Sequence, residues 1–354
     1  MSDDDDLLIN STTKIFEDLC DPQTINSAKD DSWKSPLWKA LEESGLTLAW
    51  VPENCGGSGA SLSDGFHIAE VAGRFASPIP LAETLLAGWL LSKAEIQCPP
   101  GMLTIAPIRS RDTVTVNPHG TLSGQVKGVP FASEAEHIAI MAKGNDSVRI
   151  GLVAAADCAI QSINGLSGDS RDLVNFDNVE ALKLQEPKNS MGAEDLILLG
   201  AAVRSTQIGG ALQTILTLTT DYSKERIAFE KPISKFQAVQ HNLAKLASET
   251  AAAIAAASSA ADTIANSYEN SEAVFFETAA AKIRTGEAVG EGAAIAHQVY
   301  GAIGFTEEHI LHRFTQRLWD WRNDFDSESE WAVQLGEMVA KKGAEELWPF
   351  LTTR

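Results

Sequence analysis

The sequence has few cysteines and a shortage of positive charge. Its four cysteines stand far apart and form no C-x-x-C pair, so neither a zinc site nor a disulfide framework is predicted. Lys and Arg together number 28 against 48 Asp and Glu, which gives a formal charge of −20. Such a charge repels nucleic acid phosphates and anionic membrane surfaces, so we expect neither as a partner.

The sequence also lacks a long apolar run. No stretch of about 18 apolar residues is available to span a bilayer. Four aspartates follow the first two residues, which is the opposite charge to the basic start of a secretory signal peptide. Together with the scattered cysteines, these features predict a cytoplasmic protein without a membrane anchor.

The chain has enough apolar side chains to form a large hydrophobic core. Hydrophobic residues make up 44% of the 354 residues and charged residues 21%, which is an ordinary globular composition. A chain of this length usually forms more than one substructure.

The apolar pattern changes twice along the chain and predicts three domains. Residues 1–97 and 188–354 carry apolar side chains at helical spacing, whereas residues 98–187 consist of short β-type runs broken by Gly, Asn, Asp and Pro. The predicted fold class is therefore α+β, with a helical N-terminal domain, a barrel-like middle β domain and a C-terminal four-helix bundle of long helices.

Individual elements follow from the same patterns. Ser63 is a plausible N-cap for the second of three helices predicted near the N-terminus, at residues 33–44, 61–75 and 81–94. Six strands are predicted in the middle domain, at residues 103–108, 113–116, 120–126, 137–142, 148–154 and 173–176.

Familiar catalytic motifs are absent, but one segment stands out. The sequence has no phosphate-binding P-loop, no G-x-S-x-G and no H-E-x-x-H. Around Pro232 a predicted helix ends near Arg226 and another begins with Ser234 as a possible N-cap. A guanidinium there would bind a phosphate, and Phe229 and Gln237 would offer a stacking face and an amide. The same residues could equally form a capped helix corner.

Three segments resemble signatures of the acyl-CoA dehydrogenase family. Residues 226–240 are similar to R-x-x-F-G-x-P-I-x-x-F-Q-x-V-Q, with Glu230 in place of the Gly. Residues 298–305 resemble Q-x-x-G-G-x-G-[FY], with Ala302 in place of the second Gly. Residues 46–57 are similar to G-[IL]-x-x-x-x-x-P-E-x-x-G-G. The order helical, β, helical also matches the family.

The resemblance implies an FAD-dependent oxidoreductase that desaturates the Cα–Cβ bond of an acyl-CoA thioester. In the family a carboxylate removes the α proton, a hydride passes to FAD, and an electron-transfer flavoprotein is the expected acceptor. Each flavin lies between two subunits, and one bundle contacts the pyrophosphate and adenine of its neighbour's flavin. By residue match, the cofactor-binding residues of this bundle would be Arg226, Phe229, Phe236, Gln237, Gln298 and Gly301.

The sequence departs from the family where the flavin ring and the base are expected. The family's T-E-P-x-x-G-S-D loop and W-I-[TS] strand are not found in residues 98–187. The Glu of the family's Y-E-G-T motif falls on Phe325, and the alternative base position of some relatives falls on Gly200. Asp324 and Asp326 flank Phe325 and are the remaining catalytic candidates, although an offset of one residue turns a helical side chain by about 100°.

Three hypotheses follow for the function. In the first, which we favour, the chain completes the flavin site of a second dehydrogenase-like subunit in an α2β2 heterotetramer of lipid or steroid catabolism. In the second, it is a self-sufficient homo-oligomeric dehydrogenase whose base is Asp324 or Asp326. In the third, it is a non-catalytic scaffold; the retained Arg226, Phe229 and Gln237 argue against this, because a scaffold has no use for them.

Overall fold

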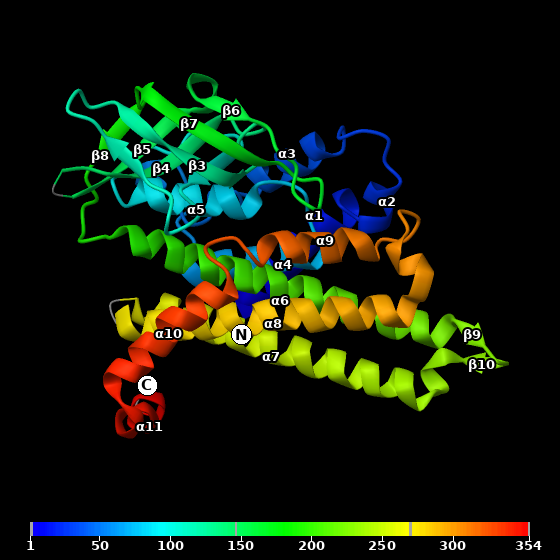
Figure 1. Cartoon of the computed structure of the whole chain (residues 1–354). Helices are drawn as coiled ribbons and strands as arrows, with labels where there is room; N and C mark the ends of the chain where they lie inside the picture. Colours follow the sequence, from blue (N-terminus) through cyan, green and yellow to red (C-terminus); the bar gives the residue numbers. More distant parts are fainter. Residues whose placement is uncertain (1–2, 146, 269–270, 353–354) are drawn as a thin grey trace.

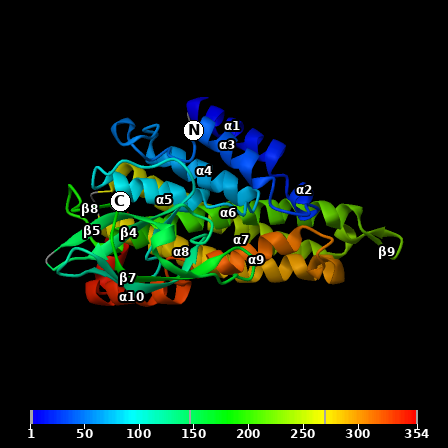
Figure 2. The same ribbon diagram turned by 90° about the horizontal axis from the view of Figure 1, so that it is seen from above.

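The chain folds into a β sheet that lies above a bundle of long helices, with shorter N-terminal helices on one side (Figures 1 and 2). The computed structural model describes residues 3–145, 147–268 and 271–352. The predicted α+β class is confirmed. No helix of the described residues is both long and apolar enough to cross a membrane.

Among the described residues, the N-terminal region has five α-helices: α1 (Asp3–Leu19), α2 (Pro22–Asn26), α3 (Lys34–Glu43), α4 (Leu62–Arg74) and α5 (Leu81–Ser92). The sequence pattern did not predict the first two. The N-cap of α4 is Ser61 and not Ser63, because Ser61 Oγ accepts from the Asp64 N–H at 3.1 Å and the Asp64 carboxylate accepts from the Ser61 N–H at 2.8 Å. Helix α4 packs on α6, and α5 is buried along almost all of its length.

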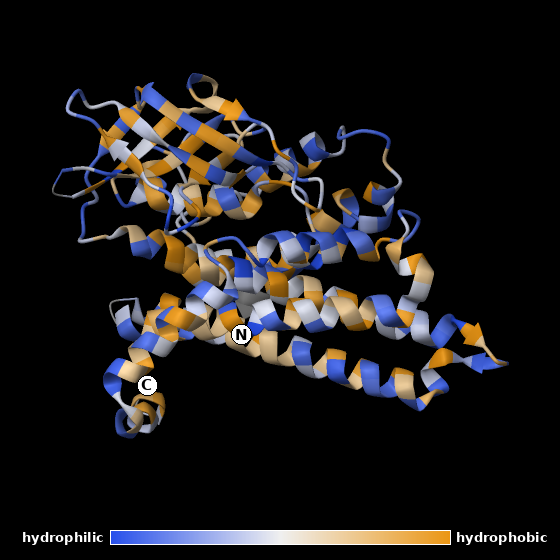
Figure 3. Ribbon diagram, in the orientation of Figure 1, coloured by the Kyte–Doolittle hydropathy of each residue, from blue (hydrophilic) through white to orange (hydrophobic). Residues whose placement is uncertain are grey.

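The middle region forms an eight-stranded sheet in the order β6-β7-β3-β2-β4-β5-β8, with β1 paired to β4. Its strands are β1 (Leu103–Ala106), β2 (Val114–Val116), β3 (Leu122–Pro130), β4 (His137–Lys143), β5 (Val148–Ala154), β6 (Ala159–Gln161), β7 (Arg171–Val179) and β8 (Lys183–Gln185). All six predicted strands occur. The two that were missed, β6 and β8, are three-residue edge strands with mostly exposed side chains and little apolar signal. The sheet carries both polar and apolar residues (Figure 3), and β4 has a run of buried apolar residues at its centre.

Three long helices dominate the C-terminal region, and the shorter α9 packs against two of them as the fourth helix of the bundle. Two further helices, α10 and α11, follow, and α11 projects from the body (Figure 1). The bounds are α6 (Ala193–Glu225), α7 (Gln237–Ser267), α8 (Ser271–Tyr300), α9 (Leu311–Trp321), α10 (Glu328–Lys342) and α11 (Ala344–Thr352). Ser234 is not the N-cap of α7, because it lies in a short 3-10 turn, Ile233–Lys235, and Phe236 precedes the helix.

The three regions share contacts rather than standing apart. One hydrophobic cluster joins side chains of the N-terminal helices, of β1, β4 and β5, of α6, α7 and α8, and of the loop after α9. Thr84 of α5 is tied to the start of β1, since its Oγ1 donates to Leu103 O at 3.0 Å and accepts from Leu103 N–H at 3.1 Å. The loop after α9 therefore lies where all three regions meet.

Candidate functional site

Two places in the structure carry the residues that the sequence singles out. One is the end of the bundle where α6 turns into α7 and where α8 ends. The other is the loop at residues 322–327, between α9 and α10.

A tight hairpin forms the tip of the bundle end (Figure 1). Strand β9 (Ile227–Ala228) pairs with β10 (Lys231–Pro232), and Phe229 and Glu230 form the two-residue turn between them. Both turn residues have left-handed backbones, with φ of +51° and +66°. A left-handed residue favours Gly, which explains why the family signature has Gly where this chain has Glu230.

Stacked tyrosines hold the ends of α6 and α8 together. The rings of Tyr222 and Tyr300 lie 4.2 Å apart, and the Tyr300 hydroxyl donates to Leu218 O at 2.8 Å. Arg226 follows α6 directly, and Gln298 lies in the last turn of α8. The structure therefore gathers the predicted cofactor residues, which are far apart in the sequence, at the same end of the bundle.

These residues face outward. Phe229 is 88% exposed, and its ring lies 6.1 Å from that of Phe236, which is half-buried. The Arg226 guanidinium is exposed and makes no hydrogen bond or ion pair with any other described residue. The remaining predicted residues, Gln237, Gln298 and Gly301, are exposed as well. The cluster is thus open to a ligand or to another chain.

The loop at residues 322–327 is fixed to the β domain and to α10. The Phe325 N–H donates to Ile108 O at 3.0 Å, and Trp331 Nε1 donates to Phe325 O at 2.8 Å. Phe325 and Asp326 both have left-handed backbones, with φ of +54° and +67°. Two successive left-handed residues without Gly are strained, so the surrounding contacts must hold them in place.

Phe325 packs directly on Gly200 of α6. A methyl group added to Gly200 would lie 2.2 Å from a carbon of the Phe325 ring, which leaves no room for any side chain there. The guanidinium of Arg204, one turn further along α6, lies 6.0 Å from the same ring. Neither position at which the family places its base carries a carboxylate.

Asp324 lies in a buried ion cluster. Its carboxylate accepts from Arg204 Nε at 2.8 Å and is also paired with Arg171 of β7, while Glu83 of α5 pairs with Arg204 from the other side. Burial alone would raise the pKa of Asp324, but the charges of Arg171 and Arg204 outweigh it and hold the pKa below the ordinary value. Asp324 is therefore occupied by structural ion pairs and is poorly placed to accept a substrate proton.

A buried lysine of α8 also contacts the loop at residues 322–327. Lys282 of α8 is 1% exposed, and its Nζ donates to Arg322 O at 3.0 Å and to Trp321 O at 3.2 Å. Burial lowers the pKa of Lys282 to about 7, although the nearby carboxylate of Asp324 acts in the opposite direction. Sequence reasoning missed Lys282 together with Glu83, Arg171 and Arg204, because no local motif marks residues that pair across such distances along the chain.

A cavity of about 460 Å³ opens beside Asp326, between the loop after β1, the start of α6 and the start of α10. Its lining includes Pro107, Arg109, Leu198 and Trp331. This cavity therefore adjoins the loop at residues 322–327, where the sequence departs from the family.

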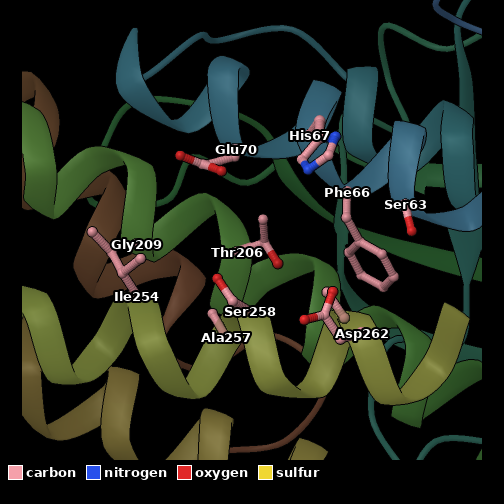
Figure 4. A pocket seen from close by; sticks show the side chains of 11 residues that line it. Ser63, Phe66, His67, Glu70, Thr206, Gly209, Ile254, Ala257, Ser258 and Asp262 are labelled. Carbon is pink, nitrogen blue, oxygen red and sulfur yellow. The ribbon is translucent and has the colours of Figure 1, made fainter. Parts of the chain in front are cut away.

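A second cavity lies between α4, α6 and α7 (Figure 4). It is lined by polar groups such as His67, Thr206 and Asp262, and its volume of about 70 Å³ has room for only about two water molecules. It adjoins neither the bundle end nor the loop at residues 322–327, and we assign it no role.

Comparisons with known proteins agree with the fold and with the bundle. Residues 197–318 match the family model described as "Acyl-CoA dehydrogenase, C-terminal domain". The acyl-CoA dehydrogenase IpdE2 of Mycolicibacterium smegmatis is 27% identical over 322 residues, which cover 90% of this chain and 93% of that protein. Its namesake in Mycobacterium tuberculosis is 28% identical over 82% of each chain. A chain of the ChsE4-ChsE5 complex from Mycobacterium tuberculosis superposes with a TM-score of 0.85 and 20% identity, covering 97% of this chain and 99% of that one.

Proposed function

Because the chain belongs to the acyl-CoA dehydrogenase family, we propose that it is the flavin-completing subunit of an FAD-dependent enzyme that desaturates an acyl-CoA thioester. In this role the chain supplies the pyrophosphate and adenine half-site, and a second dehydrogenase-like subunit supplies the flavin-ring half-site and the base. When bound, FAD accepts the hydride from the substrate.

The residues of the bundle end fit the outer half of a dinucleotide. The Arg226 guanidinium has no protein partner among the described residues and can present its planar fork to a diphosphate. The adjacent pair Phe229 and Phe236 offers aromatic faces for a base, and the exposed amides of Gln237 and Gln298 offer donors and acceptors. These groups bind and orient; none of them takes part in proton transfer.

Because these side chains point outward, they support the proposal that a partner subunit covers this end of the bundle. The hairpin that carries Phe229 stands at the far end of the bundle from α10, away from the cavity beside Asp326 (Figure 1). Exposed apolar side chains surround the cluster: Ile227, Phe229, Ile303 and Phe305. An exposed apolar group of this kind is typical of a surface that another chain covers.

The contact between Phe325 and Gly200 is the main observation behind the proposal that the partner subunit supplies the base. A general base must have a proton acceptor within hydrogen-bond reach of the substrate. A phenyl ring and a glycine fill the two positions where the family has its carboxylate, and Asp324 is held by two arginines. We therefore assign the base to the partner subunit.

The titles of two structural neighbours support the substrate class and the assembly that we propose. The ChsE4-ChsE5 structure is by its title a complex of two proteins, and another structural neighbour, with a TM-score of 0.83, is titled a steroid acyl-CoA dehydrogenase. We propose an α2β2 heterotetramer that acts on a bulky lipid or steroid-derived acyl-CoA and passes its electrons to an electron-transfer flavoprotein.

Co-expression tests this function. The chain should be produced alone and together with a dehydrogenase-like protein encoded beside it, and the mass and flavin content of each preparation should be measured. We expect flavin-poor protein from the chain alone and an α2β2 complex with two flavins. One flavin per chain in the lone protein would instead establish the self-sufficient homo-oligomer.

A further inference from the structure

A polar cavity of about 360 Å³ lies between the loop after α2, the loop between β6 and β7, and α9. Its volume is within the range of known ligand pockets, roughly 300 to 1,000 Å³. It shares no lining residue with the bundle end or with the cavity beside Asp326. Its lining has four acidic and four basic side chains, so their pairing decides which charge a ligand meets.

Hydrogen bonds hold the three walls of this cavity in place. Asn26 Nδ2 at the end of α2 donates to Glu307 O at 2.8 Å, just before α9. The Asp320 carboxylate of α9 accepts from the Leu166 and Ser167 N–H groups, at 3.1 and 2.9 Å, and so fixes the loop between β6 and β7. The cavity is therefore preformed in the free chain.

Arg313 brings an unpaired cation to one end of the cavity. The residue is half-buried, and its side chain makes no hydrogen bond or ion pair with any other described residue. Arg317, one turn further along α9, is already paired with Asp169 at 2.6 Å. Burial and the charge of Arg317 lower the pKa of Arg313 to about 10, although nearby carboxylates act in the opposite direction. This end of the cavity therefore carries more positive than negative charge.

The wall that contains Lys34 has the opposite surplus. Lys34 Nζ lies 2.9 Å from a carboxylate oxygen of Asp31 and 2.9 Å from one of Glu134, so one ammonium group serves two carboxylates. Burial alone would lower the pKa of Lys34, but the two carboxylates outweigh it and raise the pKa above the ordinary value. The side chain of Asp31 is 73% exposed and that of Glu134 is 34% exposed. Both carboxylates can therefore accept a further hydrogen bond from a ligand.

The two remaining charged residues of the lining, Lys29 and Asp30, are exposed and opposite in sign. The cavity as a whole is thus neutral, with one positive end and one negative end. A simple anion would be attracted at one end and repelled at the other, and the same holds for a simple cation. A molecule that carries both charges meets attraction at both ends.

We propose that this cavity binds a small zwitterion of the amino acid type, whose carboxylate is held by Arg313 and whose ammonium group lies at Asp31 and Glu134. The planar fork of a guanidinium fits a carboxylate, and charged donors and acceptors form the stronger hydrogen bonds. The site uses no residue of the flavin half-site, so the inference stands independently of the proposed function.

Four probes with the same trimethylene spacer test the charge pattern: 4-aminobutanoate, pentanoate, pentanedioate and butylamine. Binding to the full chain is measured by isothermal titration calorimetry at low ionic strength, because salt screens exposed charges. We expect 4-aminobutanoate to bind at least about tenfold more tightly than each of the other three, a difference of about 1.4 kcal/mol. Equal or tighter binding of any other probe would overturn the proposal, and so would the absence of binding by all four.

Variants of Arg313 test the positive end. Arg313→Gln removes the charge, so we expect it to lose about tenfold in affinity for 4-aminobutanoate, a change of about 1.4 kcal/mol. Arg313→Lys keeps the charge without the planar fork and should lose less. The control Arg111→Gln makes the same exchange at an exposed arginine outside the cavity and should leave binding unchanged.

Glu134→Gln tests the negative end. It should bring the affinities for 4-aminobutanoate and pentanoate within a few-fold of each other, because the ammonium group loses an opposite charge. Glu186→Gln removes an exposed, paired carboxylate outside the cavity and serves as control. An unchanged preference for 4-aminobutanoate in Glu134→Gln would contradict the proposed position of the ammonium group.

A variant without a charge change keeps the test decisive if the other exchanges disturb the fold. Ala28 is exposed, lines the cavity and lies outside the helices. Ala28→Trp places an indole ring in the cavity, and it should abolish the binding of 4-aminobutanoate while the melting temperature stays near that of the wild type. Unchanged binding in either Ala28→Trp or Arg313→Gln would refute the site.

Discussion

Phe325 packs on Gly200, 125 positions earlier in the chain, so closely that no other residue fits at the glycine. The two positions where relatives carry alternative bases are therefore neighbours in space, and here they form an apolar contact. An apolar contact therefore occupies the place where relatives have a proton acceptor, and for this reason we assign the base to another subunit.

Adding one methyl group tests this contact. We expect Gly200→Ala to lower the free energy of unfolding by about 1 to 3 kcal/mol, because the new Cβ forces the Phe325 ring out of place. Urea denaturation measures the change, and the double variant Gly200→Ala/Phe325→Leu should recover part of the loss. Gly336→Ala is the control: nothing lies near that exposed helical glycine, so the exchange should stabilise the chain by roughly 0.5 to 1 kcal/mol.

The buried ion cluster predicts a large effect on stability at Asp324. Asp324→Asn leaves Arg171 and Arg204 short of a countercharge inside the protein, and breaking a buried ion pair from one side costs roughly 3 to 5 kcal/mol. Denaturant unfolding of the variant measures this loss. Asp221→Asn removes a carboxylate of an exposed ion pair and should change stability by less than about 1 kcal/mol. Equal effects of the two exchanges would show that the buried cluster contributes little.

The assignment of the base predicts that catalysis survives without either aspartate. In the assembled complex we expect Asp326→Asn, and Asp324→Asn where it folds, to leave turnover within a few-fold of the wild type. Removal of a true general base typically costs about 10² to 10⁴ in rate. Stopped-flow measurement of the rate of flavin reduction distinguishes these two outcomes, provided that flavin content is unchanged. A thousandfold loss in Asp326→Asn would assign the base to this chain.

The buried Lys282 predicts a pH dependence of stability. Its pKa of about 7 lies below the ordinary 10.5, so between these two values the unfolded chain binds one more proton than the folded chain. The free energy of unfolding therefore rises with pH across this window. We expect the stability of the wild type relative to Lys282→Met, measured by urea denaturation, to increase between about pH 7 and pH 9.5. A constant difference would mean that Lys282 stays protonated throughout.

The flavin half-site predicts a binding defect at Arg226. Arg226→Ala should lower the flavin occupancy of the complex without unfolding the chain, since loss of a charge-assisted contact to a diphosphate costs about 1.5 to 3 kcal/mol. Arg226→Lys should recover only part of the occupancy, because an ammonium lacks the planar fork. Lys224→Ala, in the last turn of the same helix, removes an exposed cation paired with Asp221 and serves as control. A sharp fall in melting temperature with normal flavin content would make Arg226 structural.

The order of helices and strands along the chain follows from local patterns in the sequence. Apolar spacing is a local property, so the long helices of the bundle and six of the eight strands of the middle sheet follow from it. The departure from the family at Phe325 and Gly200 follows from the comparison with the family's motifs. The signature residues from Arg226 to Gln237 also lie close along the chain, so a short motif predicts them. The short edge strands β6 and β8 were not predicted, because their few, mostly exposed residues carry little periodic signal.

The contacts that these residues make depend on the three-dimensional fold. The Arg204 and Asp324 ion pair joins positions 120 apart, and no local pattern encodes such a pairing. Phe325 and Asp326 form a left-handed turn, and their side chains have different surroundings. The Phe325 ring covers Gly200, whereas Asp326 belongs to the lining of a cavity. Spacing along a helix cannot predict this, because a left-handed turn breaks the helical geometry on which such counting depends.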